Sequence, residues 1–160
     1  MGIDIREYRD ALGRFATGVT VITTANGDGQ LFGLTANSFT SLSLDPPLVL
    51  FCLDNNAQSF EAFNDACHFA VNILSEKQQH LSSRFAKSGP EKWEGVAFDA
   101  GHTGSPILPG SLACMECKVS SISEGGDHVI VIGEVLRMER TQEDVMPLLY
   151  YRGGYANLSS

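Results

Sequence analysis

The sequence has few basic residues, no long apolar run and no basic, apolar leader. Lys and Arg number 11 against 19 Asp and Glu, which gives a formal net charge of −8, and the basic residues are scattered. Because affinity for a phosphate backbone requires a basic face, we expect no nucleic-acid partner. A membrane-spanning helix needs about 18 or more consecutive apolar residues, and no such run occurs. We therefore expect a cytoplasmic protein that does not cross a membrane.

The sequence has four cysteines, and without an export signal the thiols are expected to be reduced rather than paired in disulfides. Cys114 and Cys117 have the C-x-x-C spacing of a metal or dithiol site. The segment that contains them is predicted to be a strand, in which residues three apart point to opposite faces. We therefore expect no metal site, and assign no metal ligand.

Several motifs of catalytic chemistry are missing. The chain has no G-x-S-x-G nucleophile motif, no H-E-x-x-H zinc motif and no Walker loop. It also lacks a G-x-G-x-x-G that opens a strand-to-helix unit, which argues against a Rossmann site. The sequence therefore gives no motif that indicates a serine nucleophile, a zinc protease, a P-loop or a Rossmann site.

The pattern of the sequence predicts β-strands with a few helices. Its length suits a single domain over residues 1–160. Apolar spacing predicts an N-terminal helix from Ile5 to Phe15, with Gly18 ending it. Ser75 to Gln78 resembles a capping box that starts a helix reaching about Ala86. About six antiparallel strands with helices predict a closed or partly closed barrel. Further elements are expected as a short helix over 59–65, a short strand at 96–98, and strands over 19–24, 48–53, 67–74, 112–123 and 128–140.

The segment from Gly33 to Ser41 interleaves hydroxyl and amide side chains with apolar ones and contains no charge. Such a mixture suits a ligand with a flat apolar ring, a polyol chain and a phosphate. The alternative is an ordinary strand and turn rich in Ser and Thr. A phosphate also needs a cation or a nest of backbone N–H groups, and Arg84 is the first candidate cation and Lys87 the second. The alternative for Arg84 is a solvated charge at a helix end.

Six short motifs occur in an order that is informative as a set: RFATGVTVI at 14–22, GLTANSFTSLSLDPPLV at 33–49, FAVNIL at 69–74, RFA at 84–86, GDH at 126–128 and YYRGGY at 150–155. Together they resemble the short-chain flavin reductases of the FMN-binding split-barrel superfamily. These are the reductase components of two-component flavin monooxygenases. The resemblance covers nearly the whole chain.

The resemblance implies a mainly β fold, a homodimer of Greek-key antiparallel split β-barrels. It implies that FMN or FAD is bound and reduced by hydride transfer from NADH, and that reduced flavin is supplied to a separate monooxygenase. NADPH would call for an Arg near its 2′-phosphate, and Arg152 is the obvious basic residue of the last motif. The alternative function on the same fold is a non-catalytic flavin-binding electron carrier or flavin store.

The same resemblance implies which residues form the site. For NADH it points to His128, Tyr151, Gly154 and Tyr155, and His128 is also the candidate catalytic residue. A plain turn residue is the alternative for His128, and packing is the alternative for the tyrosines. Trp93 is expected to be either a lid or a local anchor. The implied flavin-binding residues are Thr35, Ala36, Asn37, Ser38, Phe39, Thr40, Ser41, Cys52, Leu53, Asp54, Ser59, Arg84 and Phe85.

Overall fold

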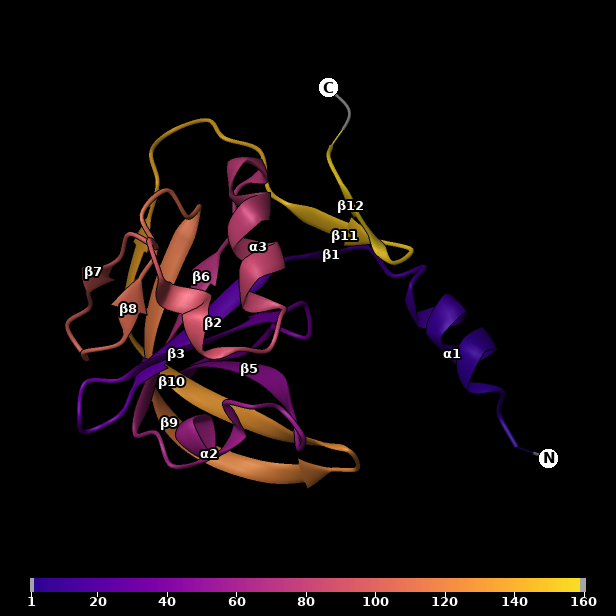
Figure 1. Cartoon of the computed structure of the whole chain (residues 1–160), viewed down its shortest axis with the longest axis horizontal. Helices are drawn as coiled ribbons and strands as arrows, with labels where there is room; N and C mark the ends of the chain where they lie inside the picture. Colours follow the sequence, from indigo (N-terminus) through magenta and orange to yellow (C-terminus); the bar gives the residue numbers. More distant parts are fainter. Residues whose placement is uncertain (1, 159–160) are drawn as a thin grey trace.

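The strands predicted from the sequence form one seven-stranded antiparallel sheet and two small sheets in the computed structural model, which describes residues 2–158 (Figure 1). The helices are α1 (Ile5–Leu12), α2 (Phe60–Asn64) and α3 (Gln79–Phe85), with 3-10 turns η1 (Glu76–Gln78) and η2 (Pro90–Trp93). The strands are β1 (Thr17–Gly18), β2 (Thr20–Ala25), β3 (Leu31–Ala36), β4 (Thr40–Leu44), β5 (Pro47–Asp54), β6 (His68–Ile73), β7 (Asp99–Ala100), β8 (Pro106–Ile107), β9 (Ala113–Gly125), β10 (His128–Arg140), β11 (Leu149–Tyr151) and β12 (Gly154–Ala156).

The large sheet is hydrogen-bonded in the order β3-β2-β6-β9-β10-β5-β4. Its two edge strands, β3 and β4, are consecutive in the chain, with only residues 37–39 between them. A connection this short spans at most about 14 Å, so the sheet has to curl until its edges come close. The mainly β, antiparallel split-barrel fold predicted from the sequence is confirmed.

The core consists of two apolar clusters, one on each face of β2. Ile22 points into the barrel, where Phe51 packs edge-on against Phe69 at a centroid distance of 5.2 Å. Val21 points the other way, into a cluster that Phe85 of α3 helps to form. The alternation of neighbouring side chains is the period-two pattern of a strand, here buried on both faces. α3 is therefore held against the outside of the barrel.

Buried threonine hydroxyls in β2 are all used as hydrogen-bond donors. Thr20 donates to the carbonyl of Ala36 at 2.7 Å, and Thr24 donates to that of His68 at 2.8 Å. Thr23 donates to the carbonyl of Pro106 at 2.6 Å. Each bond avoids the free-energy penalty of an unpaired buried polar group and ties β2 to a neighbouring segment.

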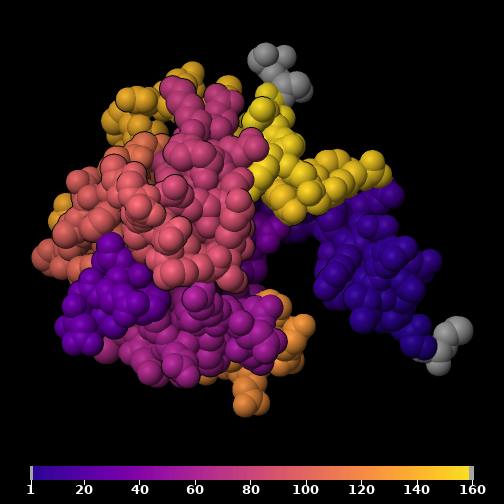
Figure 2. Space-filling view, in the orientation of Figure 1, coloured from indigo at the N-terminus to yellow at the C-terminus, as the bar shows by residue number. Residues whose placement is uncertain are grey.

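The N-terminal helix is shorter than predicted and stands away from the barrel. α1 ends at Leu12 because Gly13 caps it, whereas the sequence predicted a helix to Phe15 that Gly18 ended. α1 buries none of its residues. Figure 2 shows this segment separated from the body of the molecule and joined to it beside the C-terminal hairpin. We call α1 together with the small sheet β1-β11-β12 the arm.

Other boundaries differ less from the prediction. The capping box at Ser75 and the helix that follows it are confirmed, as is the short helix over 60–64. The short strand expected at 96–98 is wrong, because pairing with β8 begins only at Asp99. β9 and β10 are joined by a tight turn, in which Gly126 and Asp127 alone separate the two strands. Gly126 has a φ of 83°, which suits the first central position of a type II′ turn.

Among residues 2–158, no helix is both long and apolar enough to cross a membrane.

Gly133 in β10 lies where the ring of Phe69 comes closest to the sheet. A Cβ at this position would lie 2.6 Å from Cε1 of Phe69 and 3.0 Å from Cβ of Cys117. We therefore expect Gly133→Ala to lower the free energy of unfolding by about 1–3 kcal/mol, because the packed barrel has no room for it. Urea denaturation followed by circular dichroism measures this change. Gly27→Ala is the matched control, since no atom lies within 4 Å of the Cβ it adds. Equal effects of the two substitutions would contradict the steric argument.

Candidate functional site

A concave pocket lies where β3, β5, α2 and α3 meet, at the end of the barrel where the sheet is split. We call it the polar pocket, because hydroxyl, amide and charged side chains share its wall with apolar ones. It brings together many of the residues that the sequence predicted for the site, from four separate parts of the chain. These are Thr35, Ala36, Asn37, Ser38, Cys52, Leu53, Asp54, Ser59, Phe85 and His128.

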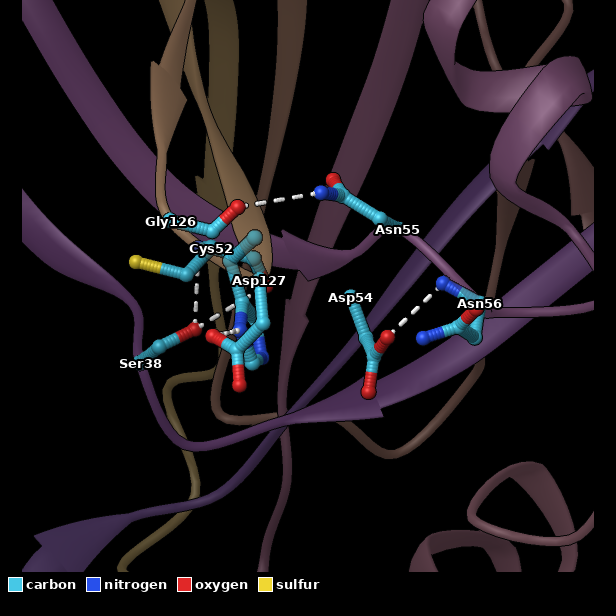
Figure 3. Close-up of polar contacts among 8 residues, drawn as sticks. Ser38, Cys52, Asp54, Asn55, Asn56, Gly126 and Asp127 are labelled. Atoms are coloured by element: carbon cyan, nitrogen blue, oxygen red, sulfur yellow. Dashed lines mark hydrogen bonds and ion pairs between the residues drawn. The ribbon is translucent and has the colours of Figure 1, made fainter.

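The connection from β3 to β4 is fixed to the barrel by side-chain hydrogen bonds. The hydroxyl of Ser38 accepts from the backbone N–H of Cys52 at 3.0 Å and lies 3.3 Å from its carbonyl oxygen (Figure 3). The hydroxyl of Thr35 donates to the carbonyl of Ser82 at 2.7 Å, which attaches β3 to α3. These hydroxyls therefore hold the wall of the pocket in place as well as facing it.

The turn that carries His128 is fastened to the end of β5. Asn55 donates from its side chain to the carbonyl of Gly126 at 3.2 Å and from its backbone to that of Asp127 at 3.0 Å (Figure 3). Asp54 accepts from the backbone of Asn56 at 2.8 Å, an Asx turn that ends the strand. The sequence prediction did not include Asn55 or Asn56, although two Asn directly after a buried strand are a recognisable turn signal.

His128 is held by the carboxylate beside it. Its Nδ1 lies 2.7 Å from Oδ1 of Asp127, and 39% of the His128 side chain is exposed. The hydrogen bond from His128 and its charge lower the pKa of Asp127. Since Nδ1 is occupied, Nε2 is the ring nitrogen left to contact a ligand.

Lys92 is the main residue of the pocket that the sequence analysis missed. Its Nζ donates to the carbonyls of Gly33 at 3.2 Å and Phe85 at 3.3 Å, and burial lowers its pKa. An ammonium has three donors, so one remains for a ligand. Lys87 also lines the pocket. Lys92 lies in η2, within a segment rich in Gly and Pro, and no sequence signal points from there to β3.

Arg84 does not line the polar pocket, and its guanidinium donates to the carbonyl of Glu94. Consecutive residues of an α-helix point about 100° apart, so Phe85 turns toward the pocket and Arg84 faces away from it. Phe39 packs against the barrel core. Thr40 and Ser41 are exposed on the edge strand β4. For these four residues, a flavin contact through this pocket is not supported within one chain.

The residues predicted for NADH, apart from His128, lie on the arm. Tyr155 packs edge-on against Tyr150, and its hydroxyl lies 2.7 Å from that of Ser82. Tyr151 is exposed, with the guanidinium of Arg152 5.6 Å from its ring centroid. Tyr151, Gly154 and Tyr155 do not line the polar pocket of their own chain.

Trp93 is a local anchor. Its ring packs edge-on against Phe85 at 4.8 Å and against Phe98 at 5.5 Å. It therefore fastens the loop that carries Lys92 onto α3.

The C-x-x-C cysteines occupy two different environments. Sγ of Cys114 lies 3.4 Å from the side-chain oxygen of Asn72, whereas Cys117 belongs to the barrel core. Burial raises the pKa of Cys114 to about 11 and that of Cys117 to about 12, so both are thiols at neutral pH. In the part of the chain that the structure describes, no three His, Cys, Asp or Glu side chains are grouped as a metal site would require.

The polar pocket is therefore suited to binding a ligand rather than to nucleophilic catalysis. Neutral donors and acceptors line one stretch of its wall, and the cations of Lys87 and Lys92 lie in another. A flat polar ring joined to a phosphate would find a matching partner for each of its parts. His128 lies at the rim, on a turn that two hydrogen bonds hold in place.

Comparison with known proteins assigns the chain to a family. The family model described as "Flavin reductase like domain" matches residues 12–159. The chain is 43% identical over 157 residues to the reductase subunit HsaB of a flavin-dependent monooxygenase from Mycobacterium tuberculosis, covering 98% of this chain and 83% of that protein. It is 40% identical to the FMN reductase (NADH) SmoA of Agrobacterium fabrum, over 99% of this chain and 88% of that one.

A solved structure agrees with these relatives. The NADH:FAD oxidoreductase SgcE6 of Streptomyces globisporus superposes with a TM-score of 0.91 at 33% identity, covering 99% of this chain and 97% of that chain.

Proposed function

The chain belongs to the flavin reductase-like domain family, and from that premise we propose that it is an NADH-dependent flavin reductase that supplies reduced flavin to a separate monooxygenase. Its relatives include a flavin-dependent monooxygenase reductase subunit and an NADH-dependent FMN reductase. The observation that carries the proposal is the polar pocket, which gathers the neutral wall, two lysines and His128 in one place. We keep residues 1–160 as a single domain in this proposal.

The residues of the polar pocket fit a flavin by the chemistry of their donors. Asn37, Ser38 and the backbone around them offer neutral hydrogen bonds of the kind that the ring and the polyol chain need. Lys87 and Lys92 supply cations for the phosphate. Leu34 and Phe85 supply apolar surface. Each part of the ligand has its counterpart in the wall.

The chemistry that the flavin supplies when bound is acceptance of a hydride from NADH. The residues of the chain have to hold the two ligands near each other and exclude water between them. Ser38 fixes the wall through Cys52, and Lys92 joins β3 to the end of α3. His128 contacts the nicotinamide ligand from the rim through Nε2. No acid–base pair is required of the protein.

We also propose that the protein is a homodimer. α1 has eight residues and buries none of them, and an isolated helix that short is unstable in water. Ile5 and Leu12 of α1 are apolar and exposed, with 69% and 55% of their surface accessible, and so is Phe15, three residues after the helix, with 78% accessible. A second copy would cover this face and bring the tyrosines of its arm toward the site.

The mass of the protein in solution tests directly whether it is a dimer. We expect wild type to have twice the mass of one chain by size-exclusion chromatography with light scattering, and Leu12→Glu to shift it toward the monomer. The reason is that a charge cannot be buried in the apolar contact without a large free-energy penalty. Arg6→Glu, on another face of α1, is the control and should leave the dimer intact. A monomeric wild type at all concentrations would disprove the proposal.

The number of NADH molecules oxidised per protein distinguishes a flavin reductase from a flavin carrier or store. With excess FMN or FAD we expect the protein to oxidise many equivalents of NADH, followed by the loss of NADH absorbance. The reason is that a reductase exchanges its flavin, whereas a carrier holds it. Oxidation of one equivalent or less per protein would favour the carrier.

His128→Ala tests the role of the rim residue. We expect the KM for NADH to rise about tenfold, which corresponds to the loss of one hydrogen bond worth about 1.4 kcal/mol. Steady-state NADH oxidation with saturating FMN measures it. His68→Ala is the matched control, because His68 lies in β6 outside the polar pocket. Unchanged KM and kcat in His128→Ala would show that His128 is only a turn residue.

A further inference from the structure

Two helices contribute separate parts of the wall of the polar pocket. Gln58 and Ser59, directly before α2, form one part. Residues 85–88, at the end of α3 and just after it, form another, and they include Lys87, one of the two lysines proposed above to hold the flavin phosphate. A flavin in the pocket is therefore enclosed by groups from both helices.

One hydrogen bond joins these two parts of the wall. The backbone N–H of Gly89 donates to the side-chain oxygen of Gln58 at 2.7 Å. Within residues 2–158, no other hydrogen bond connects residues 85–95 with residues 54–64. Gln58 is exposed, so water competes for the same donor and the net stability of the bond is small. The bond can therefore open without disturbing the barrel.

The contacts of η2, in contrast, hold it on α3. Trp93 packs edge-on against Phe85, and Lys92 donates to the carbonyl of Phe85 at 3.3 Å. The guanidinium of Arg84 donates to the carbonyl of Glu94, just after η2. Side chains at both ends of η2 are thus attached to the same helix, and η2 stays with α3 when the bond to Gln58 opens.

Residues 86–89 connect α3 to η2, and we call them the link. Lys87 and Ser88 of the link are exposed. Gly89 has a φ of 138°, which residues with a side chain rarely adopt, and no atom lies within 4 Å of the position that a Cβ would take. Glycine rotates at such a position with little steric hindrance. The link can therefore swing away from Gln58 while α3 and η2 remain in place.

The bond between Gln58 and Gly89 lies where the polar pocket meets a smaller cavity. Gln58 and Gly89 both line this smaller cavity. Gln58, Ser59 and Lys92 line the smaller cavity and the polar pocket alike. Opening of the bond would join the two spaces and widen the way out of the polar pocket.

Resting on the proposed flavin site, we propose that Gln58 is a positioning residue that latches the link across the polar pocket, and that opening of this latch sets the rate of flavin exchange. With the latch closed, Lys87 is held in the wall beside the flavin phosphate. With it open, the link swings away and flavin enters or leaves. A reductase that releases its flavin needs such a step, and loop opening limits the turnover of many enzymes.

The rate constants of FMN binding test the latch. Gln58→Met removes the hydrogen-bond acceptor but keeps the length of the side chain. Gln79→Met is the matched control, because Gln79 is exposed on α3 and lines neither cavity. Stopped-flow fluorescence gives the association rate constant on mixing and the dissociation rate constant on dilution. We expect Gln58→Met to raise both about fivefold, the factor for one neutral hydrogen bond, and to change the Kd less than twofold. The control should change none of these values.

The pattern of the rate constants separates a latch from a direct flavin contact. A latch stabilises the closed protein with and without FMN, so its loss speeds entry and exit alike. Loss of a contact speeds exit alone and raises the Kd by the same factor, and that result overturns the proposal, as do unchanged rate constants. These measurements use FMN without NADH, so a failure to oxidise NADH rejects the reductase and not the latch. FMN that does not bind at all rejects both.

Hydrogen exchange of the Gly89 amide tests closure in the flavin-free protein. We expect it to exchange about twentyfold more slowly than the amide of Gly27, measured by NMR. The reason is that the Gly89 N–H is bonded to Gln58, whereas that of Gly27 donates no hydrogen bond within the described residues. Equal exchange of the two amides would show that the latch is open in solution and would overturn the proposal.

Discussion

The pairing of β10 with β5 is the constraint on which the rest of the structure depends. Its register runs from His128 opposite Asp54 to Glu134 opposite Leu48. This register brings the tip of the β9–β10 hairpin to the end of β5, where the polar pocket begins. A slip by one residue would turn every side chain of β10 to the other face and expel Val131 from the barrel core. The aromatic contacts of Phe51 inside the barrel stabilise that register.

Most of the barrel could be predicted because its signals are local. Alternating apolar residues, the capping box at Ser75 and the β-branched run of β2 each act within one element, and each is confirmed. The errors fall at the ends of elements. β7 begins where β8 pairs with it, and α1 ends at Leu12 although apolar spacing continues to Phe15. The periodicity of apolar residues indicates which face of an element is buried, but it does not determine the residue at which the element begins or ends.

Part of the lining of the polar pocket could be predicted from the sequence, including Lys87 among its cations, but Lys92 could not. Residues 35–38 line the polar pocket as expected, because they form a continuous segment. Arg84 and Phe85 were assigned together since they are adjacent in a motif, yet a helix separates adjacent residues by about 100°. Lys92 reaches the pocket only because Trp93 packs its loop onto α3. Which side of a helix faces a cavity is set by tertiary packing, which no single motif encodes.

The split between β3 and β4 affects how the protein tolerates mutation. Both strands are edges of the large sheet, so their outer backbone groups are not used in its ladder within residues 2–158. An open seam of this kind offers main-chain donors and acceptors that every amino acid carries. Contacts made through them persist when side chains change, whereas a contact made by a hydroxyl is lost with one substitution. A contact made along the seam would therefore not depend on which side chain stands there.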